Sequence, residues 1–318
     1  MNPSASGHLL PRLSAARVPL TREVLAVTHE GGRKRILLAA ERPLTLYVDR
    51  QELVTLMTLG QEPELLALGY LLNQGLVRDA AEIESITVDW DVAAAAVRTR
   101  EGIAQFAERV ARRTVTTGCG QGTVFGDWLE RVPPLPAVAA MADAAGATAA
   151  AAHAAAPPGS VPHDVLVELL QTMRGLPSVH RDAGSVHGTA LWRAPRRSGE
   201  ADDSDDNSGA AAKMLVHIED VGRHNAVDTV AGWMAMHGVD GAGCWLYTTG
   251  RLTSEMVLKA AHLRIPVVVS RNGATAMGQQ LAERLNLTLI GRANGQRYLC
   301  YAGAARLVGL PEAVTTTV

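Results

Sequence analysis

The sequence predicts an α/β protein in two parts, a C-terminal domain built on a mainly parallel sheet and a smaller mixed α/β part before it. Three observations support this prediction. Apolar runs of strand length alternate with helical periodicity through the last third of the chain. Between residues 20 and 115, strand-like runs instead stand next to one another. The 318 residues also leave room for roughly two domains of about 150 residues each.

The composition is that of a globular protein and excludes several classes of function. Hydrophobic residues make up 47% of the chain, and 30 basic residues against 32 acidic ones leave a net charge of -2. The chain therefore lacks the basic field that non-specific nucleic-acid binding requires. Three distant cysteines, Cys119, Cys244 and Cys300, exclude a disulfide framework or a Cys-rich metal site and indicate a reducing compartment. No segment has the pattern of a signal peptide or a membrane span, so we expect a cytoplasmic protein.

The first 115 residues mix short strands with helices. Residues 1–20 contain no long apolar run and are expected to form a flexible leader. Apolar residues at helical spacing predict helices over Glu52–Gly60 and Pro63–Asn73, the second with proline in its first turn and Gly75 at its C-terminal end. Apolar runs bounded by glycine and proline predict strands within Val24–Val48, over Ser85–Val97 and over Val110–Val115.

Two low-complexity stretches divide the middle of the chain. An Ala-rich insertion covers 136–162, and a stretch of charged and small residues that exclude a packed core covers 193–213. Between them, His163–Arg174 has the pattern of an amphipathic helix, with these apolar residues on one side: Val165, Leu166, Leu169, Leu170 and Met173. The expected organisation is a leader at 1–20, an N-terminal α/β part at 21–115, a glycine-rich cysteine loop at 116–135, the insertion at 136–162, a C-terminal α/β domain at 163–307 with a flexible insertion at 193–213, and a tail at 308–318.

The last third has the most regular pattern. Strands are predicted over Met214–Ile218, Gly243–Thr248, Pro266–Ser270 and Leu287–Ile290, and helices between them over Asn225–Met236, Ser254–His262 and Thr275–Leu285. This alternation favours right-handed crossovers on a mainly parallel sheet that is covered by helices. Arg297–Tyr301 adds a last strand at an edge.

Three loops follow successive strands of this sheet, where ligands of parallel sheets bind. Each loop carries one arginine: Arg223, Arg251 and Arg271. If they converge on one mouth, they are suited to recognise a phosphate or pyrophosphate. His224 beside the first arginine is a further candidate, and the alternative is that Asp220 is a helix cap and His224 an ordinary loop residue.

The segment Thr117-Gly118-Cys119-Gly120 places a cysteine between two glycines, outside any apolar pattern. The glycines remove side-chain bulk, so a partner molecule can approach the sulfur closely. Arg112 and Arg113 just upstream favour the reactive thiolate. The alternative is a loop cysteine without a role. Cys244 and Cys300 lie in predicted strands and are expected to be structural.

Other catalytic patterns are missing from the sequence. It contains no P-loop, nucleophile elbow or HExxH pattern, and His187 lacks the carboxylate of a deaminase HxE motif. A thiol hydrolase that uses Cys119 with His187 or His224 is disfavoured, because no orienting Asp or Asn is evident by spacing.

These segments resemble the formate dehydrogenase accessory sulfurtransferase (FdhD) family over residues from about 20 to 307. The matching strings are TGCG at 117–120, VHG at 186–188, EDVGRHNAVD at 219–228, TGRLTSEMV at 249–257, KAA at 259–261, IPV at 265–267 and SR at 270–271. The two low-complexity stretches look like additions relative to the family.

The resemblance implies a cytosolic homodimer with a cytidine-deaminase-like, three-layer C-terminal domain and no metal site of its own. It implies that a cysteine desulfurase gives sulfur to Cys119 as a persulfide. Cys119 then passes the sulfur to the molybdenum, or tungsten, of the bis-molybdopterin guanine dinucleotide cofactor of formate dehydrogenase. The cofactor-binding segment that the resemblance implies is Arg292, Ala293, Asn294, Gly295, Gln296 and Arg297, and GDP-like nucleotides are expected to occupy the same site. The strand-end candidates Arg223, His224, Arg251 and Arg271 are expected to bind the cofactor as well.

The sequence departs from the family pattern at two positions. Many members carry a CGxC pair, whereas Gly122 stands at the second cysteine position here. One nucleophilic sulfur suffices to carry a persulfide, but no adjacent thiol is left to resolve it. Asn294 stands where a basic residue is expected. The missing cysteine motivates an alternative function, a non-catalytic chaperone that binds and shields the cofactor.

Overall fold

The computed structural model describes residues 9–103, 106, 114–115, 122–123, 132–136, 159–195 and 211–311. They fall into two compact units. The first comprises 1–131, 177–190 and 216–240, and the second comprises 132–176, 191–215 and 241–318. Neither unit is therefore one continuous stretch of sequence.

The first unit is built on a five-stranded sheet with the order β1-β6-β7-β4-β5. The strands are β1 (Arg12–Leu13), β4 (Arg42–Val48), β5 (Gln51–Thr58), β6 (Ile83–Asp89) and β7 (Ala94–Thr99). β4 and β5 form a hairpin whose two turn residues, Asp49 and Arg50, both have the left-handed backbone that such tight turns require. The apolar side chains of these strands pack with α1 (Pro63–Asn73) into one buried core.

The helix predicted over Glu52–Gly60 is wrong, because this segment is strand β5. Leu53 and Leu56 are both buried, and their spacing of three residues is typical of a helix. In the structure Leu46 pairs with Val54 and Tyr47 pairs with Glu52, so Leu53 is an extra residue in the ladder. This β-bulge shifts the alternation by one position and imitates helical periodicity.

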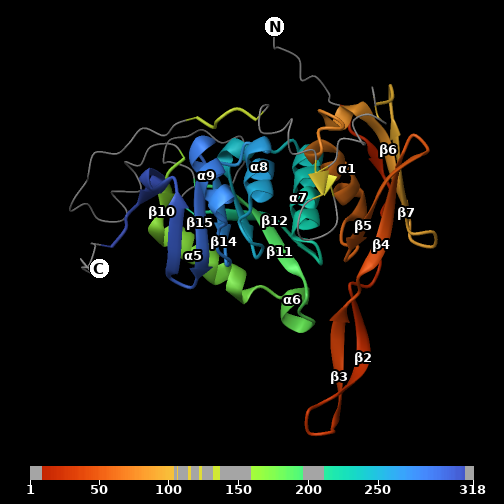
Figure 1. The fold of residues 1–318 in the computed structure, drawn as a ribbon, viewed down its shortest axis with the longest axis horizontal. Coiled ribbons are helices and arrows are strands. Elements are labelled where there is room, and N and C mark those ends of the chain that lie inside the picture. Colours follow the sequence, from red (N-terminus) through yellow and green to blue (C-terminus); the bar gives the residue numbers. More distant parts are fainter. Residues whose placement is uncertain are drawn as a thin grey trace. The chain divides into compact units, whose positions relative to one another are not determined.

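Helix α1 packs against α7 (Arg223–His237) in the first unit, as Figure 1 shows. The backbones of the two helices are in direct contact where they cross. The helix predicted over Pro63–Asn73 is confirmed with the same bounds, and Gly75 follows it in the left-handed conformation. Gly69 and Gly232 lie at the crossing, where an added Cβ would stand 1.6 Å from the Asp228 carbonyl oxygen and 2.0 Å from that of Leu65. Glycine is therefore required at both positions.

Part of the predicted leader is held by specific contacts. β1 pairs with β6, and Ser14 Oγ and the backbone N–H of Ala16 donate to Glu64 Oε1 at 2.5 and 2.8 Å. Glu64 is buried in the first turn of α1. The segment from residue 12 to residue 16 is thus attached to the first unit, contrary to the expectation of a flexible leader there.

A two-stranded hairpin extends from the five-stranded sheet of this unit (Figure 1). It consists of β2 (Thr21–Val27) and β3 (Arg33–Ala39), which pair along seven residues each. Leu25 is 58% exposed and Val27 70% exposed. Within the described residues no other strand pairs with the hairpin.

The second unit is built on the sheet with the order β12-β11-β13-β14-β15-β16. Its central strands β13 (Cys244–Thr248), β14 (Val267–Ser270) and β15 (Thr288–Asn294) are parallel, and β16 (Arg297–Ala302) is antiparallel at the edge. β11 (His187–Arg193) and β12 (Lys213–Asp220) contribute residues 191–193 and 213–215 to this unit. The predicted alternation of strands and helices is confirmed, whereas β11 was not predicted.

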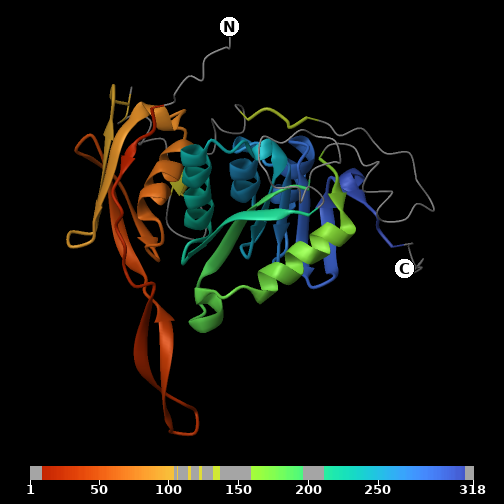
Figure 2. The ribbon, with the colours of Figure 1, turned by 180° about the vertical axis from the view of Figure 1, so that it is seen from behind.

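Helices lie on both faces of this sheet. Figures 1 and 2 together show α5 (His163–Gly175) on one face and the crossover helices α8 (Ser254–His262) and α9 (Ala276–Arg284) on the other. The short remaining elements are β8 (Thr114–Val115), β9 (Gly122–Thr123), β10 (Val161–Pro162), α6 (Val179–Asp182), β17 (Leu307–Val308) and three 3-10 turns at Ala80–Glu82, Gly241–Gly243 and Ala304–Arg306. None of the helices in the described ranges has the length and apolarity needed to cross a membrane.

Candidate functional site

The loops after β13 and β14 form one hydrogen-bonded edge in the second unit. Ser270 Oγ donates to the Gly250 carbonyl oxygen at 2.5 Å, and Asn272 Nδ2 donates to that of Thr249 at 2.7 Å. The N–H of Leu252 donates to the Gly273 carbonyl oxygen at 3.0 Å. Arg251 and Arg271 are exposed on these loops. Because parallel strands end at the same sheet edge, two of the three predicted loops do lie together.

The segment 292–297 joins the same edge. It forms the end of β15, a turn at Gly295 and the start of β16. The N–H of Arg292 donates to the Asn272 carbonyl oxygen at 2.9 Å, which ties this segment to the loop after β14. Arg292 itself has a left-handed backbone. Ala293 is buried, whereas these side chains are exposed: Arg292, Asn294, Gln296 and Arg297.

A small hollow lies between α5 and this edge, with a free volume of about 10 Å³. We call it the arginine hollow; it is lined by Leu170, Arg174, Tyr247, Arg271, Ala293, Asn294 and Gly295. Burial raises the pKa of Tyr247 to about 12, and the charge of Arg271 acts in the opposite direction. Four of the predicted cofactor-binding residues, Arg271, Ala293, Asn294 and Gly295, thus line one concave site. Its other residues are Leu170 and two that no sequence motif indicated, Arg174 and Tyr247.

The third predicted loop, after β12, belongs to the first unit. Its centre is the buried carboxylate of Asp220, which accepts hydrogen bonds from Thr58 Oγ1, from the N–H groups of Leu59 and Gly222 at 3.0 and 2.8 Å, and from Asn225 Nδ2 at 2.9 Å. Burial raises the pKa of Asp220, and these hydrogen bonds oppose that shift. The carboxylate fixes the N-terminal end of α7 against the end of β5.

Arg223 and His224 occupy the first turn of α7 and are both buried. The Nε of Arg223 has no hydrogen-bond partner among the described residues. Beside them, the Glu219 carboxylate accepts the N–H groups of Val179 and His180 at 2.6 and 3.0 Å and so caps α6. The convergence of Arg223 and His224 with the arginines of the second unit stays a prediction.

Two of the three thiols occupy the second unit's sheet. Cys244 is fully buried in β13, which agrees with a structural role. Cys300 in β16 is half-buried, its Sγ donates to the Ala302 carbonyl oxygen at 3.1 Å, and burial raises its pKa. Neither position favours a reactive thiolate.

Cys119 lies outside the described residues. The strands on either side of it, β8 and β9, pair antiparallel, with Val115 opposite Gly122. The two ends of the segment that carries Cys119 are thus held next to each other. Among the described residues, no group of three or more His, Cys, Asp or Glu side chains is arranged to hold a metal ion.

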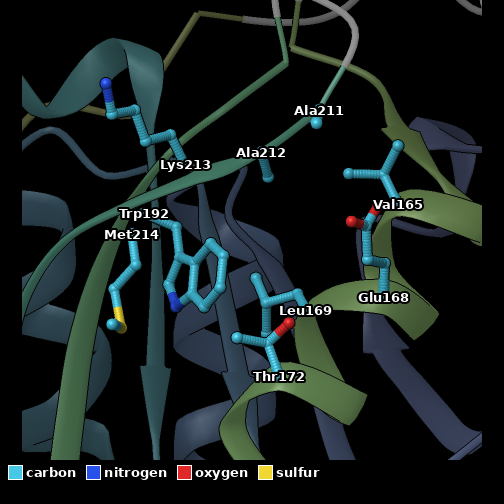
Figure 3. A pocket seen from close by; sticks show the side chains of 9 residues that line it. All are labelled: Val165, Glu168, Leu169, Thr172, Trp192, Ala211, Ala212, Lys213 and Met214. Atoms are coloured by element: carbon cyan, nitrogen blue, oxygen red, sulfur yellow. The ribbon is translucent and has the colours of Figure 1, made fainter. Parts of the chain in front are cut away.

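A larger cavity of about 390 Å³ in the second unit contains none of the predicted site residues (Figure 3). Side chains of α5 line one side of it, and residues of β11 and the start of β12 line the other. Its residues are Val165, Glu168, Leu169, Thr172, Trp192, Ala211, Ala212, Lys213 and Met214. The Trp192 Nε1 has no hydrogen-bond partner in the described part of the chain. The walls are mainly apolar, unlike the arginine hollow.

Comparisons with known proteins point to one protein family. The model of the FdhD/NarQ family matches residues 39–308. A Bacillus pumilus protein named sulfur carrier protein FdhD is 26% identical over 267 residues, which are 84% of this chain and 88% of that protein. A protein of the same name from Xanthomonas axonopodis pv. citri is 28% identical over 286 residues, 88% of this chain and 89% of that protein.

A solved structure shares the fold. The crystal structure of a putative formate dehydrogenase accessory protein from Desulfotalea psychrophila superposes with a TM-score of 0.64 at 23% identity, covering 91% of this chain and all of that one. The family match spans both units, the strand-end loops and the segment around Cys119. The chain belongs to the FdhD/NarQ family.

Proposed function

We propose that this protein is a sulfur carrier for formate dehydrogenase that holds the sulfur as a persulfide on Cys119. The observation that carries the assignment is the position of the other two thiols. Cys244 is enclosed in the sheet, and the half-buried Cys300 has a raised pKa. Cys119, between two glycines, is the thiol left for chemistry, and relatives that match most of this chain are named sulfur carrier proteins.

Loading is a thiol exchange at sulfur. The Cys119 thiolate attacks the terminal sulfur of a desulfurase persulfide, the S–S bond of the donor breaks, and the desulfurase cysteine leaves as a thiolate. A new S–S bond on Cys119 holds the transferred sulfur. The step conserves electrons and needs no further reagent. Arg112 and Arg113 precede the cysteine in sequence and favour its thiolate form.

The acceptor is the molybdenum or tungsten of bis-molybdopterin guanine dinucleotide, which we treat as the substrate. Delivery as sulfide requires two electrons, and a neighbouring thiol is a common source of them. Because Gly122 replaces that thiol here, the two electrons must come from external thiols, which are oxidised to a disulfide while the S–S bond on Cys119 breaks and the Cys119 thiolate is released. The pyrophosphate groups of the cofactor suit the exposed arginines at the sheet edge, Arg251, Arg271, Arg292 and Arg297.

The proposed function includes protein partners, an oligomeric state and a cellular compartment. Cysteine desulfurase and formate dehydrogenase are the protein partners, the protein is a homodimer, and it works in the reducing cytoplasm. The helix layers on both faces of the second unit's sheet support a cytidine-deaminase-like arrangement. Arg223 and His224 are proposed to contact the cofactor as well.

The test is a loading assay on the full chain. Incubation with desulfurase and cysteine should add one sulfur to the peptide that contains Cys119, detected by mass spectrometry after alkylation. Cys119→Ala should abolish loading and formate dehydrogenase activation, while the control Cys300→Ala should keep both. Full activation by Cys119→Ala would refute the persulfide mechanism.

That last result would favour a second function, a chaperone that binds and shields the cofactor. Gly122 and the concave arginine-lined edge support this alternative. It predicts that Cys119→Ala stays active, whereas Arg292→Ala combined with Arg297→Ala loses guanine-nucleotide binding. Unchanged GDP affinity in the double variant would exclude it.

A further inference from the structure

We propose that the outer edge of β2 pairs with β2 of a second copy of this chain, antiparallel and centred on Leu25. The inference rests on the proposed function only in expecting a homodimer, and it names the strand that joins the two copies. Residues 21–38 of the hairpin precede the family match, which begins at residue 39. The pairing is therefore argued from the hairpin alone.

Every second residue of β2 directs its backbone groups away from β3. The N–H of Thr28 donates to the Gly32 carbonyl oxygen at 2.8 Å, and that of Ala40 donates to the Leu20 carbonyl oxygen at 2.9 Å. Hydrogen-bonded pairs alternate along an antiparallel ladder, so they fall at the even-numbered positions of β2. The residues that direct their N–H and C=O groups outward are therefore Thr21, Glu23, Leu25 and Val27. No strand in the described part of the chain pairs with this edge.

The edge of β2 is better suited to accept a further strand than the edge of β3. β3 begins with Arg33-Lys34-Arg35, and basic residues protect an edge against strand pairing. β2 contains no lysine or proline, and it pairs with β3 continuously at all seven positions. Its two charges, Arg22 and Glu23, cancel. A neutral edge suits an equally neutral strand, and β2 of a second copy is such a strand.

The side chains of β2 favour one register of this pairing. With Leu25 opposite Leu25 of the second copy, Glu23 lies opposite Val27 of the second copy and away from the other Glu23. A register centred on Glu23 places the two carboxylates directly opposite each other, and one centred on Val24 makes them diagonal neighbours. Like charges in such positions are destabilising, so the register centred on Leu25 is preferred.

Charges complement each other at both ends of the paired strands in this register. Arg22 lies opposite Thr28 of the second copy, next to the turn that carries Glu30. The Arg22 side chain is exposed, and that of Glu30 is 81% exposed. Because a two-fold axis repeats every contact, opposite charges come together twice.

The pairing also covers apolar side chains that one copy leaves in water. Leu25 is 58% exposed and Val27 is 70% exposed. In the paired sheet Leu25 becomes a neighbour of Leu25 and Val27 of the second copy. A two-stranded hairpin is marginally stable by itself, whereas three or more strands with an apolar face stabilise one another. The outward backbone groups gain about six hydrogen bonds as the two hairpins form four strands.

Sedimentation equilibrium of the full chain tests this edge with proline variants. Leu25→Pro removes the N–H at the centre of the pairing and spares the hairpin, because that N–H points outward. The dissociation constant of the dimer should rise at least about tenfold, since symmetry removes two central hydrogen bonds at once. Leu37→Pro is the matched control, because it changes an outward position of β3, and it should dimerise like the parent protein. Circular dichroism and urea unfolding verify that both variants are folded.

Cysteine crosslinking tests the register. Residues directly opposite each other in a hydrogen-bonded pair have Cα atoms about 5.5 Å apart, a separation that a disulfide spans. Under mild oxidation, Leu25→Cys in a Cys119→Ala background should therefore form a disulfide between the two copies. Leu37→Cys in the same background should not, because β3 of one copy is separated from β3 of the other by both β2 strands.

The outcomes separate this inference from the proposed function. A dimer that Leu25→Pro leaves intact and that Leu25→Cys does not crosslink would overturn the pairing and leave the homodimer standing. A chain that is monomeric at every concentration would overturn both the pairing and the homodimer. Persulfide loading of Cys119 is a separate measurement, so its failure would refute the sulfur carrier and leave the strand pairing standing.

Discussion

The crossing of α1 and α7 predicts that Gly69→Ala strongly destabilises the first unit. The new Cβ would lie 1.6 Å from the Asp228 carbonyl oxygen, about 1.8 Å short of the 3.4 Å at which ordinary contact begins. The obstacle is helix backbone, so no side chain can rotate away. The helices must separate, which also stretches the buried hydrogen bond of 2.7 Å from Asn73 Nδ2 to Asp228 Oδ1.

Overpacking of a core costs about 1–3 kcal/mol where side chains can adjust, so we expect at least about 3 kcal/mol here. The assay is urea unfolding of the full chain, followed by circular dichroism. Gly175→Ala is the matched control, because Gly175 ends α5 with nothing within 4 Å of its added Cβ, and alanine is the better helix former. A loss below about 1 kcal/mol for Gly69→Ala would refute the close contact of the two helices.

Three further predictions concern buried polar groups. Asp220→Ala leaves four donors without their acceptor and should cost about 4 kcal/mol, at roughly 1 kcal/mol per hydrogen bond, in the same urea assay; a loss under 1 kcal/mol would contradict the network. Glu219→Gln should lower stability by about 1 kcal/mol because α6 loses a charged cap, and an unchanged midpoint would argue against that cap. Tyr247 should ionise near pH 12, later than an ordinary tyrosine, in an absorbance titration compared with Tyr247→Phe. Its folded pKa is raised, so its contribution to stability is complete below about pH 10 and is lost as the pH rises toward 12; ionisation near pH 10 would contradict its burial.

The helices and strands of the second unit were predictable from sequence because the hydrophobic pattern of each lies within its own short segment. The parallel strands β13 and β14 are each short, apolar and followed by a helix, so the order of elements implies a sheet edge where Arg251 and Arg271 meet. The β-bulge at Leu53 was not predictable in this way. It depends on how β5 pairs with β4, and the pairing alone explains why Leu53 and Leu56 both face the core.

Some residues of the arginine hollow were likewise predictable from sequence, and others were not. Its residues at 293–295 lie in a segment indicated by the family resemblance, and Arg271 follows a predicted strand. Arg174 lies about a hundred residues before Arg271 in the sequence. The hydrophobic pattern of its helix indicates only the apolar residues that face the sheet. Tyr247 is one of five consecutive buried residues of β13, so its sequence context indicates packing. Only the packing of α5 on the sheet brings these two side chains to the arginine hollow.

The hairpin of β2 and β3 has a practical consequence for handling the protein. Among the residues that the structure describes, the amides of these two strands pair only with each other, so in a single copy they should exchange with deuterated solvent long before those of the five-stranded sheet. The turn between its strands leads into Arg33-Lys34-Arg35, which offers trypsin three adjacent cleavage sites on an exposed strand. Limited digestion should therefore cut here more readily than in the five-stranded sheet of the same unit. Because Leu13 and Ala16 on the N-terminal side of the cut pack against the core of the first unit and β1 pairs with β6, the two fragments should remain associated after that cut.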